Sequence, residues 1–346
     1  MASDAIYYPK LGGFMKLDEY GSWHRPMLLC AAVMAVMTAV SAVGLAVDDR
    51  LIAGAPAWHK PFKFAFSFGV YALSWAWLVS LLRTRKRLAN ALSTIVVTVI
   101  LVEYAIITLQ VVRGTRSHFN VSTPLDNTLY RIMGISIAVM WTGTLALTLF
   151  LLRTPITDAA SRWAVRLGSV LSLAGLSLGA LMLLPTAAQR ESMSTSAFDG
   201  IVGAHSVGVP DGGPSMPITG WSTTGGDLRI PHFVGMHALQ LLPLIVMALT
   251  LLARRWPLLR QDTVRGRLLI VAGLSYGGVL ALVTWQALRG QPLLAPDSAT
   301  LIASAVLVFA TALGTGWALR SPSVPVAAPD DHRDAARLPV LDGAGR

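Results

Sequence analysis

The stretch GGDLRIPHFVGMHALQLLPLIVMALTLLA, residues 225–253, decides the fold of this protein. It begins as a glycine-rich loop that carries Asp227 and Arg229, passes through His232 and His237, and ends in a long apolar run. An apolar run of roughly 20 residues is what a helix needs to cross a hydrocarbon layer of ~30 Å. The stretch therefore predicts a transmembrane helix whose polar start lies at one membrane face.

The composition of the whole chain agrees with a membrane protein. Of its 346 residues 54% are hydrophobic and 13% are charged, and the mean hydropathy is +0.59, whereas soluble domains carry about 25% charged residues. Apolar runs of sufficient length occur near residues 27–47, 62–82, 90–112, 132–152, 166–185, 232–252, 268–288 and 299–319. Backbone inside lipid must satisfy its own hydrogen bonds, and these runs do not alternate as barrel strands do. We therefore predict an all-α, polytopic membrane bundle of about eight transmembrane helices.

The remaining sequence divides into three parts. Residues 1–23 mix aromatic side chains with lysines, as in segments that lie at a membrane interface. Residues 24–320 form the membrane domain, with a long outer loop at about 186–230. Loops of this length are usually functional or disordered. The mixed composition of this one is unlike that of disordered linkers, so we expect it to fold as a lid. Residues 321–346, rich in proline and scattered charge, are expected to be a disordered cytoplasmic tail.

The distribution of Lys and Arg predicts the orientation. Short connections around residues 83–87, 153–166 and 254–267 are rich in basic residues, which is typical of cytoplasmic loops. Both termini are then cytoplasmic, and the first helix, which lacks a small-residue cleavage site, is not a signal peptide. We expect a multi-pass protein of the bacterial cytoplasmic membrane, in contact with membrane lipid.

Composition also excludes several classes of function. Cys30 is the only cysteine, so an internal disulfide, a CxxC pair, a covalently attached c-type haem and a thiolate-bound cluster are excluded. The net charge of +10 is explained by topology and anionic lipid, because no nucleic-acid-binding pattern accompanies it.

Five of the seven histidines fall on the predicted outer face, near Asp126, Asp211 and Asp227; they are His59, His118, His205, His232 and His237. Imidazole is the commonest metal ligand, so these are candidate ligands, although a lone interfacial histidine is more often structural. Pro231 suits the first position of a helix. His232 and His237 would then lie about 140° apart around the axis, which disfavours one metal held by both and suits a pocket group at His237 and a rim group at His232.

Charged residues near these histidines suggest an anion and a proton path. Glu103 is expected close to the bilayer midplane, where a carboxylate usually faces a cavity, a partner or a proton path. Basic residues depart from the positive-inside tendency on the same face: Lys60, Lys63, Arg113, Arg116 and Arg229. They would meet haem propionates, a small anionic ligand or lipid headgroups.

Three segments resemble segments shared by a group of bacterial multi-pass membrane proteins to which no activity is assigned. They are WHKPFKFAFS at 58–67, RGTRSHFNVSTPLDN at 113–127, and HSVGVPDGGPSMPITGWSTTGGDLRIPHFVGMHALQLLPL at 205–244. The resemblance covers about a quarter of the chain and implies no catalytic role for any residue.

The first functional hypothesis is a redox or metal-dependent membrane protein, with a b-type haem or a copper or zinc ion held by the outer-face histidines and with a redox partner. Glu103 and Asp227 would be its catalytic residues: Glu103 would supply or accept protons, and Asp227 could join three histidines in holding zinc or copper. The alternative is a proton-coupled transporter or channel for a small anion. A third hypothesis is a non-enzymatic accessory membrane subunit whose outer loop docks a partner.

Overall fold

The computed structural model describes residues 23–320. The predicted segments 1–23 and 321–346 lie outside these residues, apart from Trp23. Within them, seven helices are long and apolar enough to cross a membrane, and a bent pair, α7 and α8, adds an eighth span if it is counted as one. The prediction of an all-α multi-pass membrane bundle is confirmed.

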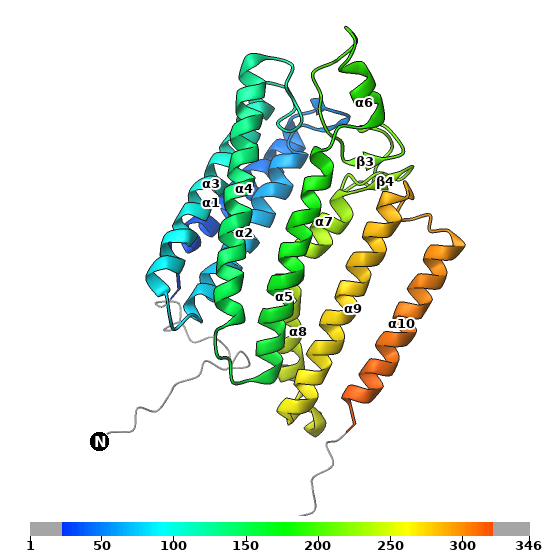
Figure 1. Cartoon of the computed structure of the whole chain (residues 1–346). Coiled ribbons are helices and arrows are strands. Elements are labelled where there is room, and N and C mark those ends of the chain that lie inside the picture. The colour runs from blue at the N-terminus through cyan, green and yellow to red at the C-terminus, as the bar shows by residue number, and fades with distance from the viewer. Residues whose placement is uncertain (1–22, 321–346) are drawn as a thin grey trace, which may run out of the picture.

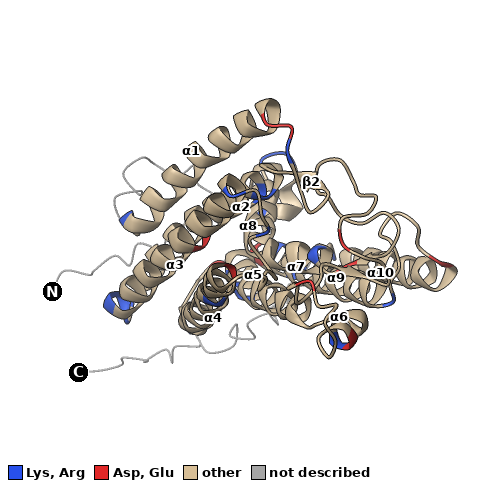
Figure 2. Cartoon of the chain, turned by 90° about the horizontal axis from the view of Figure 1, so that it is seen from above, with Lys and Arg blue, Asp and Glu red and all other residues tan. Residues whose placement is uncertain are grey.

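The spans run alternately up and down (Figure 1). They are α1 (Arg25–Val47), α2 (His59–Ser80), α3 (Lys86–Val112), α4 (Pro124–Leu152), α5 (Ala159–Leu178), α7 (Arg229–Met236) with α8 (Ala238–Leu252), α9 (Asp262–Leu288) and α10 (Ser298–Ala318). Seen from above, α1 and α10 lie at opposite edges of the bundle, and charged residues occur mostly near helix ends (Figure 2). Eight passes bring the start of α1 and the end of α10 to the same side.

We call one end of the bundle the loop end; it carries residues 48–58, 113–123, 184–228 and 289–297. A short hairpin of β1 (Leu51–Ile52) and β2 (Ala55–Pro56) joins α1 to α2. The long segment after α5 contains a 3-10 turn at Gly179–Leu183, the short helix α6 (Ala187–Ser192), and the antiparallel pair β3 (Ser206–Val207) and β4 (Gly226–Asp227). This segment covers the loop end (Figure 1).

Polar caps set where several spans begin. The Thr123 side chain accepts a hydrogen bond from the backbone N–H of Asp126, with Pro124 at the first helical position, and Asp297 caps α10 through the N–H of Thr300 at 2.8 Å. Such caps satisfy N–H groups that have no partner within the helix. The Thr123 cap starts α4 at residue 124, eight residues before the apolar run predicted at 132–152.

Two of the four apolar clusters among the described residues join most of the spans. The larger lies among α1, α2, α3 and α4 around Trp75, Met27 and Ile100, all buried. The smaller joins α5, α8 and α9 through small and branched residues such as Ala164 and Val246. α10 contacts only α9 extensively and is mostly exposed within the described chain, as expected for a helix that faces lipid.

The sixth span differs from the continuous helix predicted from its sequence. α7 begins at Arg229, two residues before Pro231, and ends at Met236; the axis then bends by 45° at His237 into α8. Side chains satisfy carbonyls at the bend: Tyr276 donates to Val234, and Ser172 donates to Met236 at 2.9 Å. A break at membrane depth is tolerated when neighbouring helices satisfy the backbone in this way.

Candidate functional site

A cavity of about 180 Å³ lies under the loop end; we call it the inner cavity. Its walls come from the first turns of α2, the last turns of α3, residues 115–119, the β1–β2 hairpin, and residues 205–229. Three of the five predicted histidines line it, His59, His118 and His205, as do four of the five predicted cations, Lys60, Lys63, Arg116 and Arg229.

Three of these cations have no carboxylate within 4 Å among the described residues. Lys60 donates to His118 Nδ1 at 2.8 Å, and Lys63 donates to the carbonyl oxygen of Thr219 at 2.8 Å. Arg116 is half-buried, and no ion pair within residues 23–320 includes Lys60, Lys63 or Arg116. The wall of the inner cavity therefore carries an excess of positive charge.

His118 connects the inner cavity to Glu103. Burial, with the Lys60 ammonium next in effect, holds the pKa of His118 well below its ordinary value, so the ring is neutral near pH 7. Its Nδ1 atom accepts a hydrogen bond from Lys60, so the single ring proton lies on Nε2, which is 3.5 Å from Glu103 Oε1. Neutral imidazole carries only one N–H.

Glu103 itself lies behind His118 and does not line the cavity. It is 3% exposed, and neither carboxylate oxygen has a hydrogen-bond partner among the described residues. A buried carboxyl without hydrogen bonds is costly.

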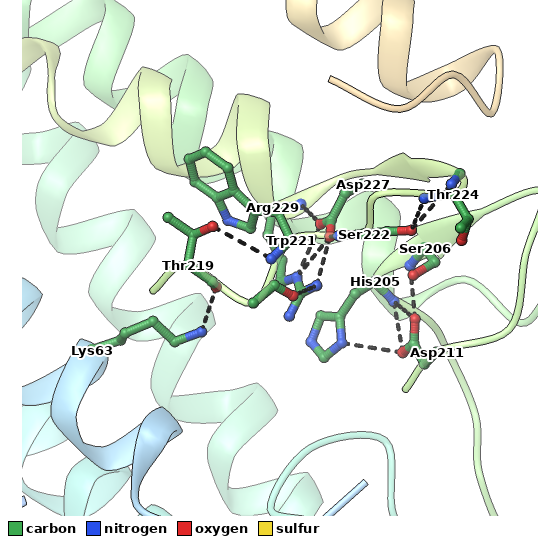
Figure 3. A network of polar contacts seen from close by, with 12 residues as sticks. Lys63, His205, Ser206, Asp211, Thr219, Trp221, Ser222, Thr224, Asp227 and Arg229 are labelled. Atoms are coloured by element: carbon green, nitrogen blue, oxygen red, sulfur yellow. Dashed lines mark hydrogen bonds and ion pairs between the residues drawn. The ribbon is translucent and has the colours of Figure 1, made fainter. Parts of the chain in front are cut away.

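His205 and Asp211 form a second polar pair. Burial lowers the pKa of His205, although the hydrogen bond to Asp211 opposes this effect. Burial alone would raise the pKa of Asp211, but hydrogen bonds from the His205 ring and from the backbone of His205 and Ser206 lower it overall. The His205 Nδ1 atom is 3.1 Å from Asp211 Oδ2, and the ring contacts Phe119. The pair uses only Nδ1 of the ring (Figure 3).

Asp227 is used to hold the loop together. Its carboxylate pairs with Arg229 at 2.5 Å and accepts the N–H of Ser222 at 2.8 Å (Figure 3). It is 1% exposed and does not line the inner cavity. Arg229 also donates to the carbonyl of Gly220 at 2.6 Å.

Arg113, the fifth predicted cation, has a similar structural role. It pairs with Asp126 at 2.5 Å and donates to Gln110 at 2.6 Å. It does not line the inner cavity.

His232 and His237 also lie outside the inner cavity. His232 Nδ1 donates to the carbonyl of Gly175 on α5 at 2.8 Å, so it does not sit at a rim beside Asp227. His237, at the bend, lies 3.5 Å from Ser67 Oγ and contacts the Phe233 ring. The two rings thus diverge, as their 140° separation predicts.

Residues 23–320 contain no group of three or more His, Cys, Asp or Glu side chains that could hold a metal ion. Sequence reasoning did not identify the backbone of residues 218–220, whose carbonyls receive hydrogen bonds from the cavity wall, nor Gly54 and Gly212, whose backbones meet above it. The glycine-rich DGG at 211–213 was the available signal for such a close approach.

Comparisons with protein-family models, with curated proteins and with solved structures find no match to this chain.

Proposed function

We propose that the protein is a proton-coupled carrier or channel that receives a small anion in the inner cavity. The observation that carries this proposal is the set of three cavity cations, Lys60, Lys63 and Arg116, that have no carboxylate partner within 4 Å among the described residues. Removing a charge from water without a counter-ion is costly. An anion in the cavity would supply the missing counter-charge.

The contact between Glu103 and His118 supports proton coupling. An anion that binds Lys60 competes with His118 Nδ1 for the lysine protons. The released nitrogen can take up a proton, and the proton on Nε2 then faces Glu103 at 3.5 Å. Entry of one negative charge would be accompanied by uptake of one proton, which keeps the charge of the buried site unchanged.

The haem and metal hypotheses have less support. Lys60 places an ammonium 2.8 Å from His118 Nδ1, where it would repel a metal cation. Pockets for drug-sized ligands measure roughly 300–1,000 Å³, and the inner cavity, at about 180 Å³, is smaller than these and too small for a haem. We place the protein in a bacterial cytoplasmic membrane. Its loop end then faces away from the cytoplasm, as the distribution of basic loops predicts.

Anion binding is tested by titration calorimetry of the detergent-purified protein with acetate, chloride, phosphate and sulfate. We expect at least one of these anions to bind, and the variants Lys63→Gln and Arg116→Gln to bind it at least tenfold more weakly. Arg131→Gln is the matched control, since Arg131 is exposed on α4 and lines neither this cavity nor its neighbouring groove. If no anion binds, or if all three variants bind like the wild type, the proposal is wrong.

Coupling is tested in proteoliposomes with an imposed pH gradient. Glu103→Gln should retain anion binding and lose the stimulation of uptake by the gradient. An optical spectrum and metal analysis of the same preparation separate the hypotheses, because a haem band or a stoichiometric metal would support the redox hypothesis instead. Binding without uptake would favour an accessory subunit.

A further inference from the structure

Two sets of close contacts lie around the inner cavity, one at its top and one at its side. Gly54 of the hairpin turn has φ +78°, and a Cβ atom there would lie 2.6 Å from the carbonyl oxygen of Gly212. Gly212 also has a positive φ, so only glycine allows the two backbones to meet this closely. The hairpin and residues 211–213 thus touch over the inner cavity and form its roof.

The second contact closes the side next to α2. Three consecutive carbonyl oxygens, those of residues 218–220, each accept a hydrogen bond from a side chain of the cavity wall: His59, Lys63 and Arg229, respectively. Figure 3 shows the bond from Lys63 to Thr219. These contacts restrict the openings of the inner cavity at the hairpin and along the 218–220 turn.

A groove of about 270 Å³ lies beside the inner cavity. Its lining includes Leu51, Gly114 and Asp199, which are exposed. Four residues line both hollows: Ile52, Ala53, Thr115 and Arg116. The partition between the exposed groove and the covered cavity therefore consists of the first hairpin strand on one side and residues 115–116 on the other.

We propose that the anion reaches the inner cavity from this groove, through the partition, and that Arg116 is the selectivity residue of the passage. This inference rests on the proposed function. Arg116 is the only charged residue that lines both hollows, and its guanidinium has no hydrogen-bond or ion-pair partner among the described residues. A free guanidinium on a flexible stem can accompany an oxyanion from one hollow to the other.

Asp199 provides the sharp test, because it lines the groove and not the inner cavity. A negative charge on the route, but away from the bound anion, raises the barrier for entry and for exit alike and leaves the affinity unchanged. A unit charge about 10 Å from the passing anion in water changes each rate about twofold. Asn at this position can still accept the N–H of Ile201, which Asp199 now accepts at 3.0 Å.

The experiment is stopped-flow tryptophan fluorescence on the full chain in detergent at low salt, with acetate and phosphate as probes. Asp199→Asn should speed association and dissociation about twofold, Asp199→Lys about fourfold, and neither should change Kd. Both effects should vanish at 1 M salt, where charges are screened within about 3 Å. Arg116→Gln should slow association and weaken binding together.

Glu191→Gln is the matched control, since Glu191 is an exposed acid at the same end that lines neither hollow. Unchanged rates for both Asp199 variants in a protein that binds the probe would overturn the route and leave the proposed function standing. A wild type that binds neither probe would overturn both. Thermal unfolding of each variant confirms that the fold is retained.

Discussion

Arg229→Gln is expected to destabilise the protein through the charge that it leaves behind. Asp227 has a fully buried side chain, and Arg229 contacts it through Nη2 at 2.5 Å and through Nε at 2.9 Å. Removing one partner of a buried ion pair costs about 3–5 kcal/mol, because the other charge stays buried and unpaired. The arginine side chain is 27% exposed, and two backbone N–H groups still reach Asp227, so we expect about 3 kcal/mol.

The double variant Asp227→Asn with Arg229→Gln removes both charges. It should recover most of this loss, with about 1 kcal/mol remaining for the altered hydrogen bonds. The assay is the free energy of unfolding from denaturant titration in detergent, with the exposed Arg131→Gln as control and an expected change within about 0.5 kcal/mol. If Arg229→Gln unfolds like the control, or if the double variant loses the sum of the single losses, the ion pair does not stabilise the loop and a catalytic role for Asp227 regains support.

Further predictions concern the helix break and acid. Gly175→Ala should cost about 1–3 kcal/mol and lower the unfolding temperature, because its Cβ would lie 2.4 Å from the Gly235 backbone; Gly134→Ala, where a Cβ meets nothing within 4 Å, should instead stabilise by up to about 1 kcal/mol. Acidification should destabilise the protein. Burial, helped by Lys60, lowers the pKa of His118 in the folded state, so as the pH falls the unfolded chain takes up this proton at a higher pH than the folded chain does. Stability should fall below about pH 6.5, by up to about 1.4 kcal/mol per pH unit until the folded pKa is reached, and His118→Asn should flatten this fall in unfolding curves from pH 7 to 5.

The bundle could be predicted from the sequence because a membrane imposes one dominant requirement. Each crossing needs about 20 apolar residues, and only helices or closed barrels satisfy the backbone there. The ends of the spans depend on weaker signals. The first two turns of α4 contain Asp126 and Asn127, so an apolar run cannot include them, although Thr123 and Pro124 specify a helix start.

The break at His237 could not be predicted because it depends on residues far apart in the chain. Gly235 packs on Gly175, 60 residues away, and the carbonyls at the bend are satisfied by Ser172 and Tyr276 from two other helices. The same packing turns His232 toward α5. Spacing along one helix predicted that the two histidines separate, and it carried no information on whether either of them would reach a cavity.

Two sets of cations at or next to the loop end differ in their partners, and this difference argues for a ligand. Arg113, Arg229 and Arg289 each pair with an aspartate, and these pairs tie the loops to the helices. Lys60, Lys63 and Arg116 line the cavity, as Arg229 does, but have no carboxylate within 4 Å in the described chain. Lys63 also donates to the Thr219 carbonyl, a contact that a neutral donor could make, and burying these charges without a counter-charge costs free energy. An anion in the inner cavity would recover that free energy, so the unpaired charges stabilise the bound state more than the free one.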